Sequence, residues 1–228
     1  MSMEKFVNEL NGDRVEGELL KTFLISLVTS VLIVGILYFT SLKNVEGFIP
    51  RYGFFIFFSI LSYAFIVPTI RQVRAYKEFA CMSGMMIGMT MGMIAGFLPG
   101  FYIASTNGMF YGSVIGMLVG ISLGVWMGKC CGIMGIMEGM MAGFMGGLMG
   151  GMTSIMLLND NLKYMTIIIF AITSFIMFGL NYMIYSEMKE NERQKNEDYT
   201  VVIGLSFILT ALTVWFIVYG PRSAFFGG

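Results

Sequence analysis

Long runs of hydrophobic residues alternate with short polar segments along the whole chain. Each run approaches the length of about 20 residues that an α-helix needs to cross a bilayer, and none alternates as transmembrane β-strands do. The pattern predicts seven transmembrane helices, at Thr22–Leu42, Gly53–Ile70, Cys81–Ala104, Met109–Met127, Gly132–Leu158, Tyr164–Tyr185 and Val201–Tyr219.

Composition agrees with this pattern, since 57% of the residues are hydrophobic and 12% are charged, about half the charge of a soluble domain. The expected fold class is therefore all-α, a polytopic integral membrane protein. We expect a cytoplasmic acidic amino-terminal segment (1–21), two transmembrane helices with a basic loop (22–80), a Met- and Gly-rich three-helix core (81–158) and two further helices around a charged loop at 186–199 (159–228).

The distribution of basic residues predicts the orientation. Ten of the fourteen Lys and Arg residues fall in the segments on the amino-terminal side, and positively charged loops stay cytoplasmic. We therefore expect a cytoplasmic amino terminus in the plasma (inner) membrane. The cluster Arg71, Gln72, Arg74, Lys77 and Glu78 is read as a topological anchor, with a patch for anionic lipid as the alternative.

Glycine recurs at every fourth position through the three central helices. This spacing removes side chains from one helix face and lets another backbone approach closely, as in small-xxx-small packing in membranes. Whether the partner is the next helix or a second copy stays open. The glycines expected to form this zipper are Gly84, Gly88, Gly92 and Gly96 in the third helix, Gly112, Gly116, Gly120 and Gly124 in the fourth, and Gly139, Gly143 and Gly147 in the fifth.

Methionine gathers in the same region, which holds 17 of the 23 methionines between residues 82 and 156. Thioethers are neutral soft donors that favour Cu(I), and by the same logic Ag(I), whereas the alternative is that methionine only fills gaps in packing. The candidate ligands follow spacings of three and four residues, at Met82, Met85, Met86, Met89 and Met93 in the third helix and Met137, Met141, Met145 and Met149 in the fifth.

Three cysteines and one acidic residue accompany these stripes. In the predicted topology Cys81, Cys130 and Cys131 all lie at the cytoplasmic end of the two stripes, where thiols stay reduced and bind Cu(I). Glu138 is the one acidic residue of the three central helices. It is a candidate for the ion pathway, since intramembrane charge is expensive; the alternatives are that it reaches the interface or pairs with Lys129.

The spacing Met85-x-x-x-Met89 beside GxxxG helices is similar to that of Ctr-type copper transporters, in which a methionine ladder follows the pore. The resemblance covers residues 81–158 and implies a shared chemistry, not membership. That family has three helices and a Met-rich extracellular tail, whereas this chain has seven predicted helices and an acidic amino terminus.

Several classes are excluded by composition. Without histidine, His-ligated haem, the common zinc sites and His-dependent nucleophiles are ruled out, and we expect no enzyme. No nucleotide-binding GxxxxGKS motif is present, and the zero net charge offers no surface for nucleic acid. The prediction is membrane transport or binding of Cu(I), with the other helices shielding the central three from lipid. The alternatives are a structural subunit of a homo-oligomer or larger complex, packed through GxxxG faces, or a channel for another ion.

Overall fold

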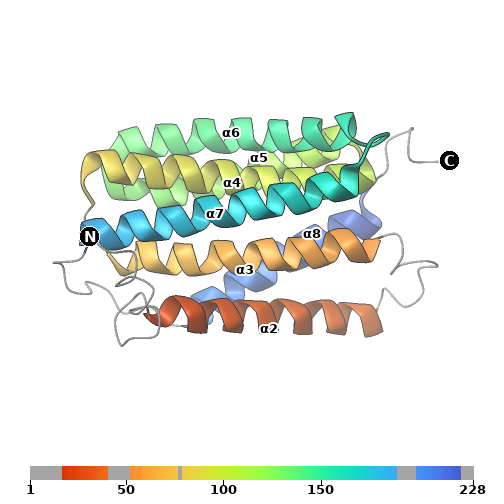
Figure 1. Cartoon of the computed structure of the whole chain (residues 1–228), viewed down its shortest axis with the longest axis horizontal. Helices are drawn as coiled ribbons and strands as arrows, with labels where there is room; N and C mark the ends of the chain where they lie inside the picture. The colour runs from red at the N-terminus through yellow and green to blue at the C-terminus, as the bar shows by residue number, and fades with distance from the viewer. Residues whose placement is uncertain (1–16, 41–51, 77–78, 189–198, 222–228) are drawn as a thin grey trace.

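The computed structural model describes residues 17–40, 52–76, 79–188 and 199–221, and within these ranges all regular structure is helical (Figure 1). Long helices lie side by side along the longest axis of the molecule. In chain order they are α2 (Gly17–Thr40), α3 (Phe54–Ala75), α4 (Cys81–Asn107), α5 (Met109–Gly128), the short 3-10 turn η3 (Lys129–Cys131), α6 (Gly132–Met156), α7 (Leu162–Met188) and α8 (Tyr199–Tyr219).

Among the described residues, six helical segments are long and apolar enough to cross a membrane, which indicates an integral membrane protein. Five of them correspond to α2, α3, α4, α7 and α8. The other is a 48-residue stretch, Met109–Met156, that contains α5, η3 and α6. The sequence predicts two spans in this stretch. By length and composition alone the stretch counts as one continuous apolar segment, because only the short turn η3 separates α5 from α6.

The end of α3 differs from the sequence prediction, which stops the span at Ile70. The helix continues to Ala75 because Arg71, 5% exposed, is held inside the bundle. Its guanidinium forms an ion pair with Glu18 (2.8 Å), donates to Thr22 Oγ1 (2.9 Å) and lies 4.0 Å from the centre of the Tyr199 ring. Arg71 therefore joins α3 to α2 and α8. Lys77 and Glu78, the other charged residues of the predicted topological anchor, lie outside the described residues.

The helices form two groups that share α4 (Figure 1). In the first group α4, α5 and α6 pack on one another, with α6 at the outer edge. In the second, α3 contacts α2, α7 and α8 around buried side chains such as Tyr63 and Ile66. Because α4 also contacts α3, α7 and α8, its side chains Phe101 and Tyr102 are fully buried between the groups. Most of the expected amino-terminal segment (1–16) and of the charged loop (189–198) lies outside the described residues.

Two glycines reverse the chain direction in the first group. Gly108 (φ 105°) is the single residue between α4 and α5, and Gly132 (φ 67°) opens α6 after η3. A positive φ is readily adopted only by glycine. These two turns make α5 antiparallel to both neighbours and α6 parallel to α4.

Candidate soft-metal face and thiol cluster

The glycines of α4, α5 and α6 meet in layers, each with one glycine from each helix. A Cβ built on Gly92 would lie 2.7 Å from the carbonyl oxygen of Gly139 and 3.2 Å from Cα of Gly124. Contacts of this kind recur one helical turn at a time. The successive layers are Gly88 with Gly128 and Gly135, Gly92 with Gly124 and Gly139, Gly96 with Gly120 and Gly143, and Gly100 with Gly116 and Gly147.

All the glycines expected to pack helices are buried, and their partners are the other two helices of the same chain. At the ends of the stack Gly112 faces Ala104, and Gly84 faces the side chains of Cys130 and Cys131. Of the two partners that the sequence left open, these faces meet neighbouring helices of the same chain in the described residues. Backbone atoms fill the space between the three helices, so that the methionine stripes lie elsewhere.

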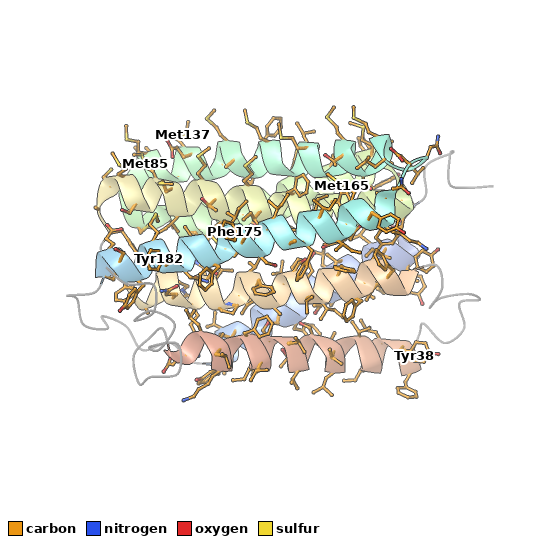
Figure 2. The ribbon with its side chains drawn as sticks, viewed as in Figure 1. Tyr38, Met85, Met137, Met165, Phe175 and Tyr182 are labelled. Atoms are coloured by element: carbon orange, nitrogen blue, oxygen red, sulfur yellow. The ribbon has the colours of Figure 1, made fainter. Side chains whose placement is uncertain are left out.

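The methionine stripes lie on the outer face of α4 and α6. In Figure 2 the side chains of α6, Met137 among them, extend away from the rest of the bundle. The main contacts of α6 are with α4, α5 and η3, so the opposite face of α6 is not covered by the described helices. The expectation that the other helices shield the three central helices from lipid is therefore wrong for this face. Met85 is partly buried. The remaining candidates are exposed, from 38% for Met93 to 74% for Met82, and comprise Met82, Met86, Met89, Met93, Met137, Met141, Met145 and Met149.

Glu138 lies on the same side of α6 as these methionines. It is partly exposed, six residues after Gly132, which is about 9 Å along the helix axis. Within the described part of the chain its carboxylate forms no hydrogen bond or ion pair, the pairing with Lys129 included.

The three cysteines come together at the start of α4 and in η3, and all three are free thiols. The Cys131 thiol donates to the backbone oxygen of Cys81 at 2.8 Å, and the Cys130 thiol donates to that of Met127 at 3.2 Å. A Cβ on Gly84 would lie 2.8 Å from the Cys131 sulfur and 3.2 Å from the Cys130 sulfur. The absent side chain at Gly84 therefore leaves the space in which the two thiols lie.

Glu187 is a neighbour of this cluster that the sequence did not reveal. The sequence places it in the charged loop, but α7 continues to Met188. Its Oε1 accepts the N–H of Ala80 at 3.1 Å, next to Cys81, while its Oε2 is buried and without a hydrogen-bond partner. No local signal joins Glu187 to residues about a hundred positions earlier, because only the packing of α7 brings them together.

In the described part of the chain, no group of three or more His, Cys, Asp or Glu side chains is arranged to hold a metal ion. Comparison of the chain with protein-family models, curated proteins and solved structures finds no match.

Proposed function

We propose that this protein binds and moves a soft monovalent cation, Cu(I) or Ag(I), in a membrane. The observation that carries the proposal is the exposed methionine face of α4 and α6, with a cluster of three thiols at one end. Thioethers bind Cu(I) without adding charge, and thiols bind it more tightly once deprotonated. The role is transport or binding and not catalysis, and it requires neither haem nor nucleotide.

The proposed topology has seven crossings, with α5 and α6 as separate spans. Support comes from their antiparallel glycine contacts, since Gly124 faces Gly139 while Gly120 faces Gly143. We place the amino terminus and the thiols on the cytoplasmic side of the plasma (inner) membrane, following the distribution of basic residues. The glycine layers act as the zipper that holds the three helices.

The ion path in this proposal follows the outer face of α4 and α6. The axis between the three helices is filled by backbone atoms, so an ion has no thioether ligands there. Successive thioethers on one helix face are about 4.5–6 Å apart along the axis. Weak sites at such intervals let an ion enter, move and leave.

A second candidate is a structural subunit of an oligomer or larger membrane complex. The uncovered face of α6 favours it, because a partner would pack there. The glycine rows are used within the chain, so the interface would consist of methionine side chains.

A four-leucine variant separates the two candidates. Replacing Met85, Met89, Met141 and Met145 by leucine nearly conserves volume, so the folded chain should persist while Cu(I) binding falls at least tenfold. The measurement is competition with a colorimetric Cu(I) chelator under reducing conditions, using purified full-length protein in detergent.

The matched control carries leucine at four methionines away from this face, Met109, Met117, Met165 and Met183. This control should bind Cu(I) like the wild type. Equal binding by the two leucine variants, or no competition by the wild type, would contradict the soft-metal proposal. Native mass spectrometry of the same samples then tests the assembly role.

A further inference from the structure

Glu138 is surrounded by thioethers along its own helix. Met134 lies four residues before it and Met141 three residues after it, spacings that place side chains on one helix face. Met134 is 60% exposed and Met141 is 58% exposed, so both lie on the outer face of α6. The carboxylate therefore interrupts a run of thioethers on a single surface.

The register between α4 and α6 brings two more methionines to the same level. The two helices are parallel, and the layers pair Gly88 with Gly135 and Gly92 with Gly139, a constant offset of 47 residues. On the flank that carries Glu138, a Cβ on Gly146 would meet the carbonyl oxygen of Met93, an offset of 53 residues, which places Glu138 level with Met85 of α4. Met85, which is partly buried, lies at that level, and Met89, which is 51% exposed, lies about one turn above it.

Among the described residues, no charged side chain pairs with the carboxylate of Glu138. No hydrogen bond or ion pair to it is formed by the described residues, and an ionised side chain in a membrane span is costly unless it is paired. A bound monovalent cation neutralises the carboxylate. Sulfur donors around it favour a soft ion over Na⁺ or K⁺, which prefer oxygen ligands.

We propose that Glu138, Met85, Met89, Met134 and Met141 form a binding site for one soft monovalent cation on the outer face of α4 and α6. This inference rests on the proposed function and assigns one step of the path. The carboxylate balances the charge, and two or three of the thioethers supply the remaining ligands. The site is separate from the thiol cluster, about 10 Å further along α6.

The test uses the full-length chain with Cys81, Cys130 and Cys131 replaced by serine, so that thiols do not mask the site. Cu(I) is the probe, added under reducing conditions against a colorimetric chelator. Glu138→Gln keeps the size of the side chain and removes its charge, and should weaken Cu(I) binding at least tenfold. Asp160→Asn, in the turn between α6 and α7, is the matched control and should leave binding unchanged.

A second variant distinguishes loss of the binding site from misfolding of the chain. Met134→Leu combined with Met141→Leu nearly conserves volume and should weaken binding to a similar degree. Size-exclusion elution identifies folded variants. If both folded variants bind Cu(I) like the control, the Glu138 site is wrong while the proposed function stands. If neither the wild type nor the serine chain binds Cu(I), both fail.

Discussion

Both helix groups pack apolar helices against one another, but they do so through different contacts. In α4, α5 and α6, glycine removes the side chains and backbones touch in layers. In α2, α3 and α8, small hydroxyls bridge the helices, as in the 2.9 Å contact between Ser26 and Ser206, and Ser62 also meets Tyr102 of α4 at 2.9 Å. Without a hydrophobic force between helices in lipid, close packing and polar contacts are the two available attractions. The first group relies on contact between backbones, and the second on the packing of large side chains together with these polar contacts.

The outer faces differ as well. The large hydrophobic side chains exposed on α2, α7 and α8 are aliphatic or aromatic, as at Leu24, Ile172 and Phe207, and no methionine is among them in the described residues. On α4 and α6 the exposed face is mostly methionine. Lipid contact requires only apolar side chains, and the first set meets that requirement. The methionine bias therefore calls for a reason beyond hydrophobicity, which the soft-cation proposal supplies.

The largest loss of stability is expected for a substitution in the glycine layers. A Gly92→Leu change places a side chain where a Cβ already meets the Gly139 carbonyl oxygen at 2.7 Å. Backbone cannot yield as a side chain does, and overpacking of this kind destabilises by about 3 kcal/mol or more. Thermal unfolding in detergent measures the loss. The control is Gly179→Leu on α7, where nothing lies within 4 Å, and equal effects of the two changes would contradict the layer packing.

An intermediate effect is expected at the ion pair of the second group. Arg71→Met keeps most of the apolar length but leaves Glu18 without its guanidinium partner. Breaking a buried pair costs about 3–5 kcal/mol, and since Glu18 is partly exposed to solvent we expect about 2 kcal/mol. Urea or thermal unfolding in detergent should show this loss, whereas Lys163→Met at the exposed start of α7 should not.

The smallest effect is expected at a single hydroxyl. Ser26→Ala removes the contact with Ser206 Oγ, whose own proton is donated to the carbonyl oxygen of Val202. Hydrogen bonds between transmembrane helices average about 0.6 kcal/mol. If Ser26→Ala destabilised the protein more than Gly92→Leu does, the contrast between the two groups would be reversed. Thr29→Ala is a suitable control, because its hydroxyl bonds only to its own helix.

The sequence located the apolar helices to within about five residues, because hydropathy over about 20 residues is a strong signal, whereas six candidate spans stand in the described residues where it predicted seven. It stopped α3 at Ile70, since a cluster of basic residues that begins at Arg71 reads as the end of a span, and it placed Glu187 in a loop. Both errors have one cause: a charged residue can lie in a helix when a distant helix supplies its partner. Arg71 finds Glu18 on α2, and Glu187 meets the backbone of Ala80.

By itself the sequence determined the helical class, the apolar spans and the glycine and methionine periodicities, all of which depend on residues close together in the chain. Only the tertiary structure decided that the glycine faces of α4, α5 and α6 pack against one another, and that their methionines consequently lie outside. Periodicity fixes which residues share a helix face but not what that face meets. Three glycine rows can touch only if the helices turn those faces inward, and this leaves the opposite, methionine-bearing faces of α4 and α6 at the surface.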